Sequence, residues 1–221
     1  MEKKGVPGRV LAAYCACFYA VWTVAEGWVW PLLGQVVTNS YGLQLLKSGL
    51  LKNAVWTLPA CLLMMRYRDA LAVDPRALFR RFAGWRRYLP VFAVLAVVVL
   101  VAAMRTRRTL ALSPAFSGEQ LIVVLFVGIT EEAVFRGWLL NATLPALGRW
   151  PALLLNAAMF LGIHFPIWSA QGVFWKNLAD GTFLGIMALS VLFGWAMLRS
   201  ENLWVPVSLH MFYDLLCFLW I

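Results

Sequence analysis

The sequence predicts an all-α fold: a polytopic transmembrane bundle of seven or eight helices around a membrane-embedded polar cavity. Hydrophobic residues make up 62% of the 221 and charged residues only 13%, whereas soluble domains average about 45–50% and about 25%. The apolar residues are gathered into runs long enough to cross a bilayer. The two histidines of the chain, His164 and His210, both lie inside such runs. Together these observations indicate an integral membrane protein with polar chemistry at membrane depth.

Seven segments have the length and composition of membrane spans, each of which needs about 20 mostly apolar residues. The first run is too long for the roughly 7–15-residue core of a signal peptide and is read as a retained span. Lys47 and Lys52 obscure the start of the second span, the third is short, and the fifth could be partly re-entrant. The expected spans are roughly residues 10–34, 44–65, 89–104, 118–140, 150–168, 181–198 and 203–221.

The loop between the second and third spans is rich in arginine. The stretch RYRDALAVDPRALFRRFAGWRRY carries apolar residues at roughly helical spacing, and Pro75 suits a helix start. It predicts an amphipathic helix at about 67–88 on the cytoplasmic face. Lys3, Lys4 and Arg9 place the N-terminus on the same side, although the arginines after the third span oppose this topology. The net charge of +9 lies in loops between spans, which excludes a nucleic-acid partner.

The fourth span contains the motif EEAVFRG. Glu132 and Arg136 are four residues apart and can pair on one helix face. Glu131 is rotated by about 100° from its neighbour, so its carboxylate is expected to be unpaired and partly desolvated, as suits a general base. The alternative is a polar helix end with both acids in water.

The two histidines also occur in pairs of residues that are four positions apart. Phe160 and His164 share a helix face in FLGIH, and His210 and Asp214 share one in HMFYD. Each pair alone is compatible with a buried structural role. Three apolar helices that all carry ionisable groups indicate instead one polar site assembled between them. No HExxH, GxSxG or Walker motif is present in the sequence.

The ordered set EExxxR, FxxxH and HxxxD resembles the CPBP family, the CAAX-protease and bacteriocin-processing group of glutamic intramembrane proteases, related to the type II CAAX prenyl endopeptidases. The similarity covers about residues 118–218. It divides the chain into N-terminal membrane helices with the amphipathic helix (1–117) and a CPBP-like catalytic core (118–221), in one integrated membrane domain.

The resemblance implies hydrolysis of a peptide bond at the membrane by an activated water. Glu131 would activate the water with help from His164, and His210 with residue 214 would stabilise the oxyanion. Glu132, Arg136 and Phe160 would support them. The family often has asparagine where this chain has Asp214. Because an ionised carboxylate only accepts hydrogen bonds, we expect Asp214 to orient His210 and favour its protonated form rather than to touch the oxyanion.

The expected partners are the lipid bilayer and a membrane-anchored or lipid-anchored protein or peptide substrate. The expected location is a bacterial inner membrane, with the N-terminus cytoplasmic and the active site opening toward the cytoplasm. No cofactor is expected, but two histidines with carboxylates also resemble a zinc or manganese set. The alternatives are a metal-dependent hydrolase with the same residues, a non-catalytic binding or immunity protein, and a proton-coupled transporter.

Overall fold

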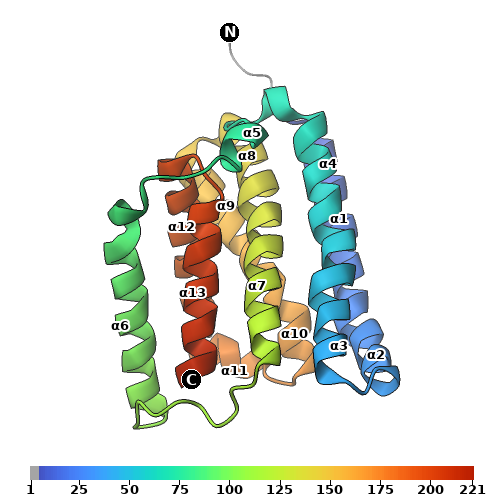
Figure 1. Cartoon of the computed structure of the whole chain (residues 1–221). Helices are drawn as coiled ribbons and strands as arrows, with labels where there is room; N and C mark the ends of the chain where they lie inside the picture. Colours follow the sequence, from blue (N-terminus) through green and yellow to red (C-terminus); the bar gives the residue numbers. More distant parts are fainter. Residues whose placement is uncertain (1–4) are drawn as a thin grey trace.

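The computed structural model describes residues 5–221, and in these the secondary structure is helical throughout, as predicted (Figure 1). Each of the seven apolar segments forms a helix. Within this described part of the chain, four helices are long and apolar enough to cross a membrane by themselves, and they lie at Gly8–Val36, Trp85–Thr106, Arg149–Ala170 and Thr182–Ser200. Lys3 and Lys4, which support the predicted topology, lie outside the described residues.

The first two helices form a hairpin. The first consists of α1 (Gly8–Val24), a π-helical turn η1 (Ala25–Val29) and α2 (Trp30–Val36). The second consists of α3 (Ser40–Gln44), the π segments η2 (Leu45–Leu51) and η3 (Asn53–Thr57), and α4 (Leu58–Arg66). Pro31 and Pro59 each follow a π turn. Proline lacks an N–H and crowds the preceding turn, and a local π widening relieves that conflict without ending the helix.

The other five helices complete the bundle. They are α6 (Leu89–Thr106); α7 (Glu119–Glu132) continued by the π segment η6 (Ala133–Leu140) and α8 (Asn141–Leu147); α9 (Arg149–Gly162) continued by α10 (His164–Ala170); α12 (Thr182–Ser200); and α13 (Trp204–Trp220). A short helix, α11 (Phe174–Ala179), connects α10 to α12. Helix α13 packs on α7 and α6, and α12 packs along α9.

The single amphipathic helix expected at 67–88 is not what forms there. The segment instead has three short pieces: η4 (Arg68–Ala70), α5 (Pro75–Leu78) and η5 (Trp85–Tyr88). The side chain of Asn141 accepts a hydrogen bond from Val73 N (2.7 Å) and donates one to Val73 O (2.8 Å). Asn202 donates to Arg80 O at 2.7 Å. These side chains, which are distant in sequence, form hydrogen bonds with backbone groups of the segment. Those backbone groups therefore do not need the hydrogen bonds of a continuous helix.

The N-terminal and C-terminal halves share one core. The ring of Phe18 lies 4.5 Å from that of Trp56 and 5.9 Å from that of Phe135, measured between centroids. Trp22 and Trp56 stack edge to face at 4.4 Å, and Trp22 donates to Ile163 O at 2.8 Å. The first two helices are thereby attached to the helices that carry the sequence motifs.

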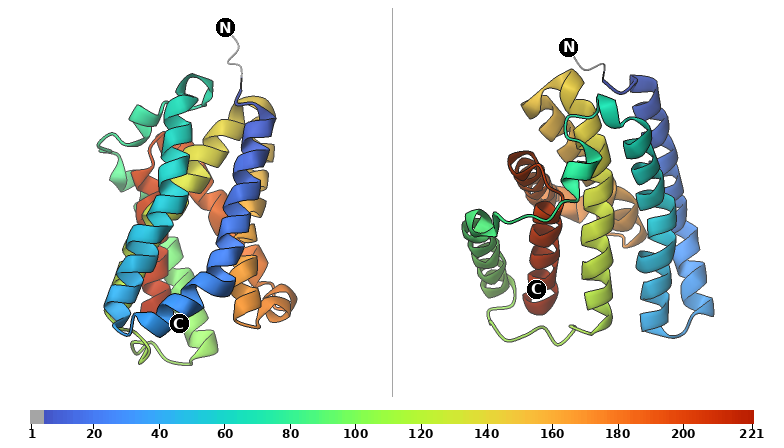
Figure 2. Two further views of the ribbon diagram at one scale, coloured as in Figure 1. Left: turned by 90° about the vertical axis from the view of Figure 1, so that its right-hand side faces the viewer. Right: turned by 45° about the horizontal axis from the view of Figure 1, so that its top comes forward.

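The elements of the bundle gather at two opposite ends (Figures 1 and 2). At one end lie the start of α1, the segment between α4 and α6, α8, and the turn between α12 and α13. We call this the arginine-rich end. At the opposite end lie the turn between α2 and α3, helices α10 and α11, and the C-terminus; we call this the α11 end. The arginines at the first end are Arg9, Arg66, Arg68, Arg76, Arg80, Arg81, Arg86, Arg87, Arg149 and Arg199.

Candidate active site

Glu132 and Arg136 form a fully buried ion pair in the middle of the bundle. Both are 0% exposed, and Arg136 Nη1 donates to Glu132 Oε1 at 2.9 Å. The i,i+4 pairing expected from the sequence is therefore present. Arg136 Nη2 also donates to the backbone oxygen and the hydroxyl of Ser190 on α12, at 3.0 and 2.9 Å. Ser190 is a supporting residue that the motif spacing did not indicate, because it lies on another helix.

His210 joins this pair from α13. Its Nδ1 atom lies 2.8 Å from Glu132 Oε1. Because a carboxylate only accepts, Nδ1 carries the proton, and Nε2 faces the rest of the site. The ring of Phe193 stacks on the imidazole at 5.1 Å between centroids, and Phe160 contacts it at 5.9 Å. His210, which is only 5% exposed, is thus held in orientation by packing and by one charged hydrogen bond.

Glu131 is not the unpaired carboxylate that the sequence led us to expect. Its Oε1 atom accepts a hydrogen bond from Lys52 Nζ on the second helix at 2.9 Å. Glu131 is 7% exposed and Lys52 is 6% exposed. In the sequence, Lys52 only obscures the start of the second span. A charged residue within an otherwise apolar span was the signal that could have identified it.

The second oxygen of Glu131 faces His210. Glu131 Oε2 lies 3.9 Å from His210 Nε2. The contact is longer than a hydrogen bond, so the two groups are adjacent without being bonded to each other. A carboxylate oxygen and a ring nitrogen at this separation are both directed at one small region of the site.

His164 reaches the same region from the junction of α9 and α10. Its Nδ1 lies 3.1 Å from Phe160 O, four residues earlier. A carbonyl oxygen cannot donate, so Nδ1 carries the hydrogen and Nε2 of the neutral ring is left as an acceptor. His164 and His210 both contact the ring of Phe160, at 5.4 and 5.9 Å between centroids. Phe160 therefore spaces the two histidines.

Asp214 is close to His210 but does not form its shortest contact. Asp214 Oδ2 lies 3.5 Å from His210 Nε2, compared with 2.8 Å between Glu132 Oε1 and Nδ1. Our expectation that Asp214 orients the ring is therefore revised, because Glu132 makes the orienting hydrogen bond. Asp214 adds negative charge on the Nε2 side.

Two pockets reach these residues, and both extend toward the α11 end. One, of about 290 Å³, is lined by both histidines and Asp214 together with Thr182 and Gly185 near the start of α12. The other, of about 250 Å³, is lined by Glu131 and Lys52, and its remaining lining includes Glu26, Gln44 and Lys47 of the first two helices. In the direction of the arginine-rich end, every residue from Thr130 to Thr143 is buried. The site is closed on that side by packed side chains.

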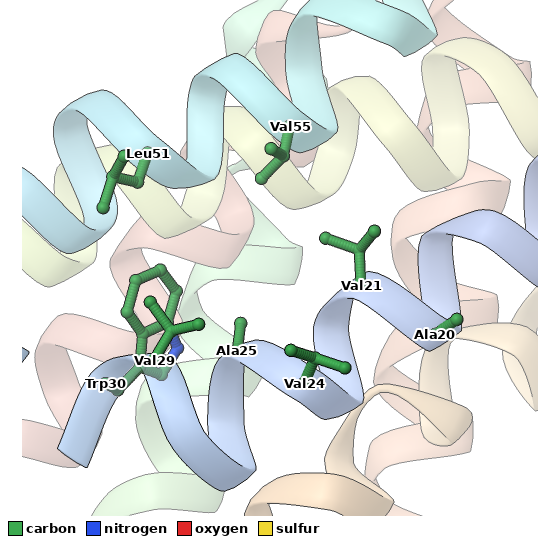
Figure 3. Close-up of a pocket in the computed structure, with 8 residues that line it drawn as sticks. All are labelled: Ala20, Val21, Val24, Ala25, Val29, Trp30, Leu51 and Val55. Atoms are coloured by element: carbon green, nitrogen blue, oxygen red, sulfur yellow. The ribbon is translucent and has the colours of Figure 1, made fainter. Parts of the chain in front are cut away.

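A third pocket, of about 350 Å³, has no such chemistry. It lies between the first and second helices, with Val21, Val24 and Val29 facing Leu51 and Val55 (Figure 3). Its lining is aliphatic apart from Trp30, whose indole N–H donates to Glu26 Oε1 at 3.1 Å. This groove is therefore not the candidate site.

The arrangement of the site residues is also relevant to the alternative of a metal-dependent hydrolase. Among residues 5–221, no group of three or more His, Cys, Asp or Glu side chains has an arrangement that could hold a metal ion. The carboxylates of the site are paired instead with cations: Glu131 with Lys52, and Glu132 with Arg136 and His210.

Fold and site together define a class: a helical membrane protein with buried glutamate–histidine pairs at the centre of its bundle. Residues 113–216 match the family model described as "Type II CAAX prenyl endopeptidase Rce1-like". This match confirms the resemblance carried by the three motifs: the segment that bears the site is similar to the CAAX protease family. No curated protein and no solved structure matches the chain. The matched segment is thus similar to CAAX-type endopeptidases, a family of proteases that act on membrane-anchored proteins.

Proposed function

We propose that the protein is a glutamic intramembrane endopeptidase whose nucleophile is a water molecule activated by Glu131. The observation that carries this proposal is the convergence of Glu131 Oε2 and His210 Nε2, 3.9 Å apart, beside a pocket that His164 also lines. A general base and a hydrogen-bond donor on either side of one small space are what water attack on an amide requires.

The proposed steps assign one role to each group. Glu131, assisted by the free Nε2 of His164, takes a proton from water as the water oxygen bonds to the substrate carbonyl carbon. His210 acts as the imidazolium, with both ring nitrogens protonated, and its Nε2–H donates to the resulting oxyanion. The carbon–nitrogen bond then breaks, and the proton held by Glu131 passes to the departing amine. Glu132, fixed by Arg136, stabilises the charge on His210 during these steps.

The proposed substrate is a membrane-anchored or lipid-anchored protein or peptide, cleaved beside its anchor. The site lies in the middle of an apolar bundle, and its pockets contain both polar and apolar surface. Such a site admits an extended peptide at membrane depth, whereas a water-soluble globular protein cannot reach it. No cofactor is part of this proposal.

We place the protein in a bacterial inner membrane with the arginine-rich end in the cytoplasm, because positively charged loops stay on that side. We expected both a cytoplasmic N-terminus and a site that opens to the cytoplasm. The two expectations are incompatible, because the N-terminal helix begins at one end of the bundle and the site pockets extend toward the other. The start of α1 lies at the arginine-rich end (Figure 1). The linings of both site pockets, in contrast, extend toward the α11 end. The charge distribution supports the N-terminal assignment. We therefore propose that the site opens on the non-cytoplasmic side.

The test of the activity is a termini-resolved proteomic comparison of membranes that contain wild-type protein or Glu131→Gln at equal levels. Glu119→Gln, at the start of the same helix, is the matched control, because Glu119 accepts from Ser117 and lies outside the site. We expect new protein termini with wild type and with the control but not with Glu131→Gln. Identical termini in all three samples would contradict the proposal and favour a non-catalytic membrane protein.

A further inference from the structure

Lys52 is the one buried lysine among the described residues. It lies on the second helix, outside the matched residues 113–216 and outside the three motifs found in the sequence. An ammonium group at membrane depth is expensive unless it is paired, and such groups are usually retained for function. Lys52 is paired with Glu131, so a function of its ammonium group must act on that carboxylate.

The geometry gives Lys52 a directional role. Its ammonium group donates a hydrogen bond to Glu131 Oε1 at 2.9 Å, so that Glu131 Oε2 is directed toward His210. The ammonium is itself held by two rings, with Nζ 4.4 Å from the centroid of Trp56 and 5.1 Å from that of Trp22. Cation–π contacts of this kind restrict where the ammonium can sit. The two tryptophan rings therefore fix the Lys52 ammonium in place, and the ammonium in turn sets the rotation of the Glu131 carboxylate.

The charges also balance within the site. Glu132 is neutralised by Arg136 on its own helix, whereas no cation on α7 reaches Glu131. The second glutamate of the motif depends on Lys52 for its compensating charge. An uncompensated carboxylate at this depth would take up a proton and could no longer accept one from water.

We propose that Lys52 is a positioning residue for the reaction: it keeps Glu131 ionised and turns Oε2 toward the space shared with the histidines. This inference rests on the proposed function. It means that the catalytic unit extends beyond the matched segment to the second membrane helix, which supplies an ammonium group enclosed by two tryptophans.

A lysine outside the site provides a matched control. Lys176, on α11, is exposed, and its ammonium pairs with Asp180 at 3.1 Å. It lines neither of the two site pockets. Removal of Lys176 therefore removes one positive charge from the protein without changing the contacts of Glu131.

The experiment uses the protein termini that depend on Glu131 as its readout. Their initial rate of appearance is measured in membranes with equal amounts of wild type, Lys52→Met, Lys52→Arg, Lys176→Met and Glu131→Gln. Folding of each variant is checked by its melting temperature in detergent. We expect Lys52→Met to slow cleavage by at least about 100-fold, the scale of a general-base contribution. Lys52→Arg, which keeps the charge, should retain more than about a tenth of the rate. Lys176→Met should stay within about threefold of wild type.

Two results would overturn the role of Lys52 while leaving the proposed function intact. One is a folded Lys52→Met that cleaves within about threefold of wild type while Glu131→Gln is inactive. The other is a folded Lys52→Arg that is as inactive as Lys52→Met. If Lys52→Met does not fold, Lys52→Gln replaces it and is judged by the same criteria. Unchanged cleavage by Glu131→Gln would overturn the proposed function and, with it, this role.

Discussion

Glu132 Oε1 lies 2.8 Å from His210 Nδ1, although the two residues are separated by 78 positions and belong to different helices. The same oxygen accepts from Arg136 Nη1 at 2.9 Å. One buried carboxylate oxygen therefore joins an arginine and a histidine, and the orientation of the imidazole depends on it. The predictions below begin with this contact.

Glu132→Gln should destabilise the protein by about 3–5 kcal/mol, because it leaves the fully buried Arg136 without a compensating charge. The measurement is the midpoint of thermal or denaturant unfolding in detergent. Glu201→Gln is the control: Glu201 is exposed in the turn before α13, and its loss of charge should change stability by less than about 0.5 kcal/mol. Equal midpoints for the two variants would show that the buried pair does not stabilise the fold.

The two histidines should respond differently to alanine substitution. His164→Ala should lower cleavage by about 10²–10⁴-fold while leaving stability nearly unchanged, since the hydrogen bond of His164 is to Phe160 O of its own helix. His210→Ala should lower both, because it also removes the partner of buried Glu132. Cleavage rates and unfolding midpoints of the same preparations distinguish the cases. An equal loss of stability in both variants would contradict the roles assigned here.

Asp214→Asn should keep His210 in place, because Glu132 rather than Asp214 makes the orienting bond. We expect cleavage within about tenfold of wild type, since an amide can also donate to an oxyanion. The pH dependence of cleavage should nevertheless change, because one carboxylate 3.5 Å from Nε2 has been removed. A variant with wild-type activity and a wild-type pH profile would show that Asp214 does not influence His210.

Gly128 should be intolerant of a side chain because it allows α7 and α13 to approach each other. A Cβ atom there would lie 2.4 Å from Met211 Cγ and 3.4 Å from Val207 O. Gly128→Ala should therefore destabilise the protein by about 1–3 kcal/mol, as overpacking usually does. The matched control is Gly185→Ala on α12, where nothing lies within 4 Å of the added atom. That variant should be as stable as wild type or more stable by up to about 1 kcal/mol, the helix preference of alanine over glycine.

Membrane orientation can be tested by cysteine labelling. In a variant whose four cysteines are replaced by alanine, single cysteines are introduced at Gln171, exposed at the α11 end, or at Ala83, exposed at the arginine-rich end. A membrane-impermeant maleimide on intact spheroplasts should label Gln171→Cys and should label Ala83→Cys only after permeabilisation. The reverse pattern would place the site pockets on the cytoplasmic side.

Much of the fold followed from the sequence, because a membrane helix needs a run of apolar residues and all seven predicted runs are helical. The pairing of Glu132 with Arg136 was also predictable, because residues four apart on a helix are neighbours. The grouping of the motifs around His210 followed from the high cost of polar groups at membrane depth. Each of these inferences uses local or compositional information.

Only the tertiary structure decided which groups meet across helices. Lys52 pairs with Glu131 across 79 positions, Ser190 holds Arg136, and Glu132 rather than Asp214 contacts His210 most closely. The arginine-rich segment was predicted as one helix, but side chains of Asn141 and Asn202 satisfy its backbone in shorter pieces. Helical periodicity shows which side chains share a face of one helix, and it contains no information on which faces of different helices pack together. That packing also determined that the site opens toward the α11 end.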